Sequence, residues 1–409
     1  MARNLTLLTD LYELTMMQGY FFEKDQNETV IFDAFYRKNP DDNGFAVCAG
    51  LEQVIELINN LHFEEDDIEY LRSTGLFKEP FLDYLKTFKF TGNVYAIPEA
   101  TYMFPREPIV KVIAPIMEAQ LVETALLNII NHQCLIATKS YRIVHAAQGD
   151  GVMEFGLRRA QGPDAGLYGA RAAVIAGCVG TSNVLTGKMF DVPVLGTHAH
   201  SWIMSFPDEL TAFTTYARLY PNACTLLVDT YDTLTSGVPN AIKTFDLMKK
   251  EGVKLTSYGI RLDSGDLAYL SKKARKMLDD AGYPDAKICA SNDLDEYLIA
   301  SLKEQNAAIN SWGVGTNLIT SKDCPSFGGV YKLAAIKSKE TGHFVPKIKL
   351  SENAEKITNP GNKKIYRFYN NEDNKIIADL ICFDSEVVDE NEDYVLFDPI
   401  ETWKKTKLK

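Results

Sequence analysis

The apolar positions of the first 145 residues predict a mixture of helices and strands. Leu51, Val54 and Ile58 recur at helical spacing, whereas residues 28–37 are rich in β-branched and aromatic side chains, which favours a strand. Further helices are predicted at residues 5–22, 115–130 and 137–147, and a pair of strands around residues 88–104. We therefore expect residues 1–145 to form a mixed α+β domain.

From residue 151 onward, short apolar runs alternate with amphipathic segments. The apolar runs predict strands at residues 152–157, 192–195, 225–228, 255–260, 286–290 and 310–314. The longer segments between them predict helices at residues 207–220, 238–251, 265–281 and 294–304. Such alternation builds a parallel sheet, either an open doubly wound sheet or a closed barrel. Because no Gly-x-Gly-x-x-Gly joins a first strand to a helix, we favour an irregular, TIM-like α/β barrel over residues 146–340.

The pattern changes again after Tyr331. Residues 341–409 contain short β-like runs and turn signals such as Asn-Pro-Gly-Asn at residues 359–362. We expect a small β-rich C-terminal segment that packs on the N-terminal domain.

Composition narrows the class of protein. The net charge of −12 argues against a nucleic-acid partner, because such proteins are usually basic. The seven cysteines form no Cys-x-x-Cys pair, which favours reduced thiols and disfavours structural zinc. We find neither the apolar core of a signal peptide nor a run of ~18 apolar residues that could span a membrane. We expect a cytoplasmic protein without a membrane partner.

Polar, charged or glycine residues stand at the carboxyl end of every predicted strand. In a βα barrel these ends converge on one face, where catalytic residues collect. Arginine offers fork-shaped donors to phosphate, glycine amides approach phosphate oxygens, and carboxylates hold hydroxyls or Mg²⁺. The set predicts an anionic, phosphorylated ligand with a metal, and its members are Phe155, Arg158, Thr197, His200, Asp229, Arg261, Asp263, Gly315 and Thr316.

Each of these residues also has a plainer interpretation. Arg158 could form a surface ion pair, and a lone His200 is more often structural than catalytic. Asp229 could cap the helix that follows it, and Asp263 or Ser264 could cap the next one.

Three longer motifs are more specific than single strand ends. They lie at residues 154–164 (Glu-Phe-Gly-Leu-Arg-Arg-Ala-Gln-Gly-Pro-Asp), 196–201 (Gly-Thr-His-Ala-His-Ser) and 261–266 (Arg-Leu-Asp-Ser-Gly-Asp). Through them the chain closely resembles the nicotinate phosphoribosyltransferases, within the wider type II phosphoribosyltransferases, over essentially its whole length. The resemblance implies an irregular α/β barrel joined to an N-terminal α/β sandwich domain.

The resemblance also implies roles for single residues. His200 matches a histidine that ATP phosphorylates transiently. Phe155 matches an aromatic residue that stacks on the pyridine ring, and Tyr12 matches a tyrosine that covers the other face of that ring from a neighbouring subunit. Arg37 is expected to reach the diphosphate.

Further matches concern the sugar and its phosphates. Arg158, Thr197 and Arg261 match residues that line the nicotinate and phosphoribosyl sites. Asp229 and Asp263 match carboxylates near the ribose hydroxyls and the metal. The loop that takes the 5′-phosphate is matched by Gly315 and Thr316.

The resemblance implies ATP-coupled transfer of a phosphoribosyl group from 5-phosphoribosyl 1-diphosphate to nicotinate, in NAD biosynthesis. ATP is the co-substrate, Mg²⁺ is held mainly by substrate phosphates, and the enzyme is a homodimer with shared active sites. Residues 181–183, Thr-Ser-Asn, are neutral where nicotinamide-using relatives place an aspartate, so a nicotinate carboxylate is not repelled.

Three alternatives remain open. The chain could use nicotinamide or quinolinate instead. A sugar-phosphate isomerase or aldolase would need a lysine or paired carboxylates, and no Schiff-base lysine stands at the strand ends. A non-catalytic descendant would be expected to have lost some of the strand-end residues.

Overall fold

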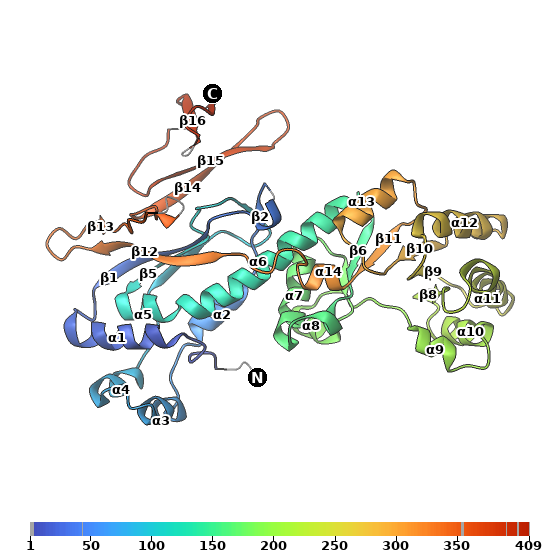
Figure 1. Ribbon diagram of the computed structural model, residues 1–409, viewed down its shortest axis with the longest axis horizontal. Coiled ribbons are helices and arrows are strands. Elements are labelled where there is room, and N and C mark those ends of the chain that lie inside the picture. The colour runs from blue at the N-terminus through green and yellow to red at the C-terminus, as the bar shows by residue number, and fades with distance from the viewer. Residues whose placement is uncertain (1–3, 43, 353–355, 390, 399–400, 409) are drawn as a thin grey trace. The chain divides into compact units, whose positions relative to one another are not determined.

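A computed structural model describes residues 4–42, 44–352, 356–389, 391–398 and 401–408. The chain divides into two compact units. The first contains residues 1–131 and 328–409, and the second contains residues 132–327. Figure 1 shows both units along the colour gradient of the chain.

The first unit is built on a five-stranded antiparallel sheet with the order β13-β12-β1-β5-β3. Its strands are β1 (Thr29–Tyr36), β3 (Asn93–Ala96), β5 (Val110–Pro115), β12 (Gly329–Lys337) and β13 (Phe344–Pro346). β1 is buried along nearly its whole length, as expected of a central strand. The smaller strand pairs are β2 (Ala46–Val47) with β4 (Tyr102–Met103), β14 (Lys363–Tyr369) with β15 (Ile376–Phe383), and β16 (Tyr394–Phe397) with β17 (Lys405–Leu408).

Two details of the first unit differ from the sequence-based expectation. The strands expected around residues 88–104 exist as β3 and β4, but they pair with β5 and β2 rather than with each other. The two helices expected at residues 115–130 and 137–147 are instead a short helix and one long helix, because residues 131–136 contain no Gly or Pro that would end a helix. The helices that begin in the first unit are α1 (Leu11–Glu23), α2 (Leu51–Asn59), α3 (Glu65–Ser73), α4 (Glu79–Leu85), α5 (Ile116–Leu121) and α6 (Glu123–Ala146), and α6 continues into the second unit from residue 132.

The second unit contains a six-stranded parallel sheet with the order β7-β6-β11-β10-β9-β8. Its strands are β6 (Gly151–Glu154), β7 (Gly180–Thr181), β8 (Cys224–Leu227), β9 (Tyr258–Leu262), β10 (Lys287–Ala290) and β11 (Ser311–Val314). The end strands β7 and β8 do not pair with each other, so the sheet is a parallel half-barrel. The predicted irregular α/β fold, with its smaller β segments at both ends of the chain, is confirmed in this form.

Helices follow the strands of the half-barrel, as the alternating pattern predicts. Figure 1 shows α10, α11 and α12 beside β8, β9 and β10. The helices are α7 (Pro163–Ile175), α8 (Val184–Phe190), α9 (His200–Met204), α10 (Glu209–Leu219), α11 (Val238–Lys250), α12 (Leu267–Asp280), α13 (Glu296–Glu304) and α14 (Thr316–Ile319), with shorter turns at Leu157–Arg159 and Thr233–Gly237.

The strand predicted at residues 192–195 is wrong. These residues make only one parallel bridge, between Thr181 and Val194, and the Val194 side chain is 48% exposed. Pro193 lacks an N–H group and so cannot extend a ladder. The segment reaches the edge of the sheet without becoming a buried strand.

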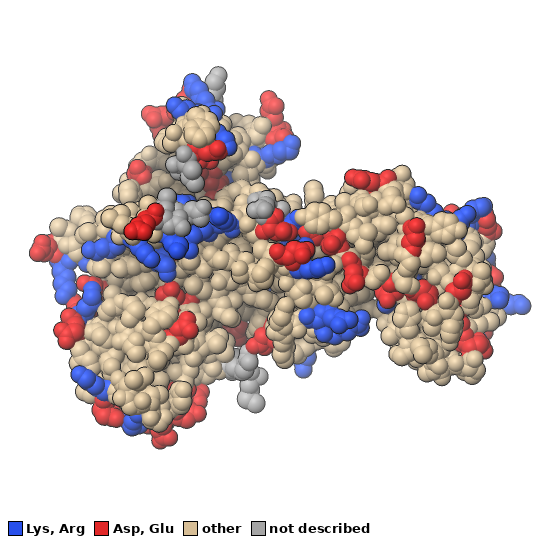
Figure 2. All heavy atoms as spheres, in the orientation of Figure 1, with Lys and Arg blue, Asp and Glu red and all other residues tan. Residues whose placement is uncertain are grey.

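All seven cysteines are free thiols. Within the described ranges, no helix has both the length and the apolar character needed to cross a membrane. On the face shown in Figure 2, acidic and basic side chains are scattered in small groups among uncharged ones.

Candidate active site

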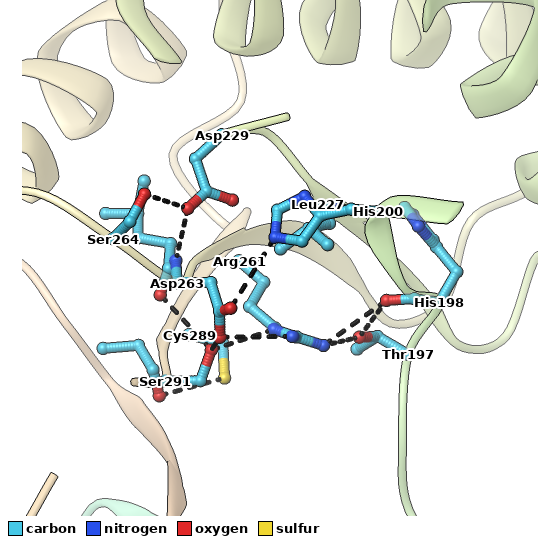
Figure 3. A network of polar contacts seen from close by, with 12 residues as sticks. Thr197, His198, His200, Leu227, Asp229, Arg261, Asp263, Ser264, Cys289 and Ser291 are labelled. Atoms are coloured by element: carbon cyan, nitrogen blue, oxygen red, sulfur yellow. Dashed lines mark hydrogen bonds and ion pairs between the residues drawn. The ribbon is translucent and has the colours of Figure 1, made fainter. Parts of the chain in front are cut away.

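Arg261 is the centre of a polar network at the carboxyl ends of the half-barrel strands (Figure 3). Its Nε donates to Ser291 Oγ at 2.9 Å, and its Nη1 donates to Thr197 Oγ1. Its Nη2 lies 3.2 Å from Asp263 Oδ1, which also accepts a hydrogen bond from Ser291 Oγ. Only 14% of the Arg261 side chain is exposed, so its orientation is fixed by these partners.

His200 begins α9 and faces this network. Its Nδ1 lies 3.0 Å from Thr230 Oγ1, and its Nε2 lies 3.7 Å from Asp263 Oδ2. The imidazole points toward Asp263 in Figure 3. Because 40% of the side chain is exposed, a dissolved reactant can reach the ring.

Asp229 follows β8 and contacts Asp263 and Ser264 in the loop after β9. Its Oδ2 accepts hydrogen bonds from the backbone N–H of Asp263 at 3.1 Å and from Ser264 Oγ at 2.6 Å. Its Oδ1 is buried and has no hydrogen-bond partner among the described residues. A buried acceptor without a partner is costly, which suggests that a ligand supplies the missing donor or cation.

Phe155 lies at the end of β6, against the glycine-rich end of β11. A Cβ atom at Gly313 would lie 2.6 Å from Cδ2 of the Phe155 ring, so only glycine leaves room for the ring there. The backbone N–H of Phe155 donates to the carbonyl of Val314 at 2.8 Å. Gly315 and Thr316, which follow directly, form the start of the short helix α14.

Phe155, Gly315 and Thr316 make no hydrogen bond to the Arg261 network among the described residues, and neither do three further predicted site residues. Arg158 is exposed on a 3₁₀ turn just after Phe155. Tyr12 and Arg37 belong to the first unit, whose placement relative to the half-barrel is not described. Burial raises the pKa of Tyr12, and the Glu123 carboxylate raises it further. The Nε of Arg37 is buried without a hydrogen-bond partner among the described residues.

The capping alternatives for the aspartates are wrong. Asp232, not Asp229, caps the turn after β8, by accepting from the N–H groups of Leu234 and Thr235. Asp266, not Asp263, caps α12. Asp229 and Asp263 instead make their hydrogen bonds within the Arg261 network.

Thr230 and Ser291 belong to the network but were not predicted as site residues from the sequence. Both stood within strand-end motifs. The signal that could have found them was their position, because each comes directly after a residue that ends or follows a parallel strand. Their contacts with His200 and Arg261 emerge only from the folded geometry.

Comparison with known proteins decides the family. Residues 151–376 match the nicotinate phosphoribosyltransferase (NAPRTase) family, which is more than half of the chain. The chain belongs to the nicotinate phosphoribosyltransferase family. Residues 7–131 and 362–409 match the N-terminal and C-terminal domains of the same enzymes.

Relatives in this family span nearly the whole chain. The nicotinate phosphoribosyltransferase of Bacillus subtilis is 49% identical over 400 residues, covering 98% of this chain and 80% of the relative. One of Mycobacterium tuberculosis is 44% identical over 361 residues, covering 88% of this chain and 75% of the relative. The crystal structure of the human nicotinic acid phosphoribosyltransferase superposes with a TM-score of 0.83 at 28% identity, covering 98% of this chain and 86% of that one.

Proposed function

We propose that the Arg261 network is the active site of a nicotinate phosphoribosyltransferase that acts in NAD biosynthesis. The reaction joins nicotinate to 5-phosphoribosyl 1-diphosphate and is coupled to ATP hydrolysis. The observation that carries the proposal is Arg261 itself, a largely buried cation whose guanidinium joins Asp263 and Ser291 at two strand ends to Thr197, within the family to which the chain belongs.

In the sugar-transfer step, the ring nitrogen of nicotinate attacks C1 of the ribose. The C1–oxygen bond to diphosphate breaks, and the diphosphate leaves with the bonding electrons. This step needs no protein nucleophile, so the protein acts by positioning the reactants, which can lower a barrier by ~7–11 kcal/mol. Phe155 would stack on the pyridine ring, Arg158 and Arg261 would face the anionic groups, and Gly315 with Thr316 would take the 5′-phosphate.

His200 would serve a separate cycle. A neutral ring nitrogen attacks the γ-phosphorus of ATP, and ADP leaves with the electrons of the broken bond. Water later hydrolyses the phosphohistidine and releases phosphate. The half-exposed ring and the Thr230 hydroxyl at 3.0 Å support this role, because the ring is both accessible and oriented.

The residues present fit a Mg²⁺ ion that shares its ligands with substrate. Asp229 Oδ1 is a buried acceptor without a hydrogen-bond partner in the part of the chain that the structure describes, and the side chain of Asp263, whose backbone N–H donates to Asp229, is 31% exposed. Over the part of the chain that the structure describes, no group of three or more His, Cys, Asp or Glu side chains could hold a metal alone. Asp229 and Asp263 would hold the ion together with phosphate oxygens, and it would neutralise charge on the diphosphate.

We infer a homodimer in which Tyr12 completes the neighbouring subunit's site. Its helix α1 exposes Leu11 at 55%, Tyr12 at 45% and Met16 at 39%, which is an apolar surface suited to an interface. Arg37, whose Nε has no hydrogen-bond partner among the residues described, would reach the diphosphate. The unpaired thiols of all seven cysteines support a cytoplasmic location.

An assay with nicotinate, nicotinamide and quinolinate, each with and without ATP, tests the proposed function. We expect nicotinate to be the preferred substrate and ATP to increase its conversion. Comparable kcat/KM values for nicotinate and nicotinamide would contradict the proposal. Ser182→Asp should lower kcat/KM for nicotinate, since a new carboxylate would repel the substrate.

A further inference from the structure

Glu154 is a fully buried carboxylate at the end of β6, directly before Phe155. Its Oε1 accepts a hydrogen bond from the backbone N–H of Gly156, and its Oε2 accepts one from Thr181 Oγ1 at 2.6 Å. No lysine, arginine or histidine among the described residues acts on its charge. Burial raises the pKa of Glu154, and the two donors oppose that change.

A backbone N–H group determines that the Thr181 hydroxyl donates to Glu154. The backbone N–H of Asn183 donates to Thr181 Oγ1 at 2.9 Å, so the hydroxyl oxygen is already an acceptor. The single hydroxyl proton of Thr181 is then directed at Glu154. Both oxygens of Glu154 therefore receive donors, which is the pattern that suits an ionised carboxylate.

The same carboxylate ties together two segments that flank the proposed nicotinate pocket. One is the turn of Phe155 and Gly156, which carries the ring proposed to stack on the pyridine. The other is residues 181–183, whose neutral Ser182 is proposed to tolerate the substrate carboxylate. The backbone reinforces this link, because the N–H of Ser182 donates to the carbonyl of Glu154 at 2.9 Å.

The link extends into the helix that follows. Asn183 is buried and caps α8, since its Oδ1 accepts from the N–H groups of Leu185 and Thr186. Its Nδ2 donates to the carbonyl of Gly166 in α7. Glu154 is thus connected to α7 and α8 through Thr181 and Asn183, although an apolar side chain would avoid the cost of burying a carboxylate.

We propose that Glu154 is a positioning residue that fixes Phe155 and Ser182 relative to each other, and so sets the affinity and selectivity of the enzyme for nicotinate. The proposal rests on the proposed function. Glu154 does not need to touch the substrate. Its carboxylate acts through the Gly156 N–H and the Thr181 hydroxyl.

Steady-state kinetics of the full-length Glu154→Gln variant test the proposal. A glutamine amide offers only one acceptor oxygen, so one of the two donors loses its partner. We expect KM for nicotinate to rise about tenfold, with KM for 5-phosphoribosyl 1-diphosphate changing by less than about twofold. Discrimination between nicotinate and nicotinamide should fall together with nicotinate affinity.

Two substitutions at the partner residue form a matched pair. Thr181→Val keeps the shape of the side chain but removes the hydroxyl, and should raise KM for nicotinate in the same selective way. Thr181→Ser keeps the hydroxyl and should behave like the wild type. This pair decides the question if Glu154→Gln does not fold, which thermal unfolding would show.

Different results would contradict the positioning role of Glu154 and the proposed function. Any of four results would overturn the positioning role while leaving the proposed function intact. They are equal increases of KM for both substrates, a loss of kcat alone, unchanged kinetics, and a Thr181→Ser variant as impaired as Thr181→Val. A wild-type protein that neither binds nor converts nicotinate would overturn the proposed function, and this inference with it.

Discussion

His198 and His200 stand two residues apart but occupy opposite environments. His198 is buried, its Nε2 accepts from the backbone N–H of Leu227 at 3.3 Å, and its ring packs edge-on against Tyr216. Burial lowers the pKa of His198 to about 4, so its ring is neutral near pH 7. His200 is 40% exposed and faces the Arg261 network. Of the two, His200 is the one that ATP can approach.

Incubation with γ-labelled ATP and Mg²⁺ should place an acid-labile, base-stable phosphate on His200. His200→Asn should abolish the label and the stimulation by ATP, while slow ATP-independent transfer remains, because attack at C1 needs no histidine. His198→Asn is the control and should still be labelled. Label that maps to His198, or full ATP coupling in His200→Asn, would show that the assigned role is wrong.

Much of the candidate site could be predicted one residue at a time, because parallel strands bring their carboxyl ends to one edge. That argument identifies Arg261 and Asp263 at the end of β9. It identifies Thr197 as well, although the strand expected before Thr197 does not form, and the Arg261 guanidinium joins all three. It could not separate Asp229 from Asp232, since both precede the same helix and either could cap it. Only the folded hydrogen bonds show that Asp232 is the cap.

At the scale of elements, the approach of α11 to β8 depends on Gly237. A Cβ atom at this position would lie 1.8 Å from the carbonyl oxygen of Val228, the residue before Asp229. Gly237→Ala should therefore move one backbone segment away from the other, destabilise the protein by about 3 kcal/mol or more, and displace Asp229. Urea unfolding and the transfer assay measure the two effects.

Gly19 provides the matched control. It lies exposed in α1, and a Cβ atom there would meet no other atom within 4 Å. Gly19→Ala should stabilise the protein by up to about 1 kcal/mol, because alanine favours helix. If both variants unfold at the same urea concentration, the close contact at Gly237 does not destabilise the Gly237→Ala variant.

A buried glutamate, Glu13, links α1 to the start of α6 by hydrogen bonds. Glu13 is fully buried and accepts from the hydroxyl of Thr9 and from the backbone N–H of Thr124 at 3.0 Å. Burial raises the pKa of Glu13 to about 7, although these donors act in the opposite direction. The folded protein therefore binds the proton more tightly than the unfolded chain does.

The stability that this proton contributes is fully present at pH values below the ordinary glutamate pKa. It is lost as the pH rises toward about 7, where Glu13 ionises in the folded state. The slope is at most about 1.4 kcal/mol per pH unit, less any screening by solvent. In urea unfolding, the free energy of unfolding of the wild type should fall relative to that of Glu13→Gln as the pH rises from 5 to about 7, and the difference should then stay constant up to pH 8. Parallel curves would show that Glu13 does not titrate there.

Helices with an amphipathic pattern over several turns were predicted correctly, whereas segments that pair over only one or two residues were not. α11 and α12 begin within about two residues of their predicted starts, since their amphipathic pattern spans several turns. The strand expected at residues 192–195 did not form, and the two-residue strand β7 was missed. A strand of that length carries no period, and its pairing with β6 is set by the fold.

At the scale of the whole molecule, the chain returns to its first unit after completing the half-barrel. β12 lies within the range assigned to the barrel by sequence, yet it pairs with β1 at the centre of the antiparallel sheet. The contact between Phe32 and Tyr331, whose rings stack at 4.8 Å, joins residues that are distant in the chain. No strand was expected at residues 329–337, and its partner could not be found from local patterning because the completed sheet decides the pairing.

The proposed dimer predicts that two inactive variants can restore each other. Tyr12→Ala removes the residue that would reach across the interface, whereas Arg261→Ala removes the centre of the half-barrel network. In a mixed dimer, one site has both substitutions and the other has neither. Random exchange of equal amounts makes half of the dimers mixed, so activity should recover to about a quarter of the wild-type value, measured as nicotinate conversion after subunit exchange. Dimers of each variant alone provide the baseline. If exchange is verified and activity stays at that baseline, each site is complete within a single chain.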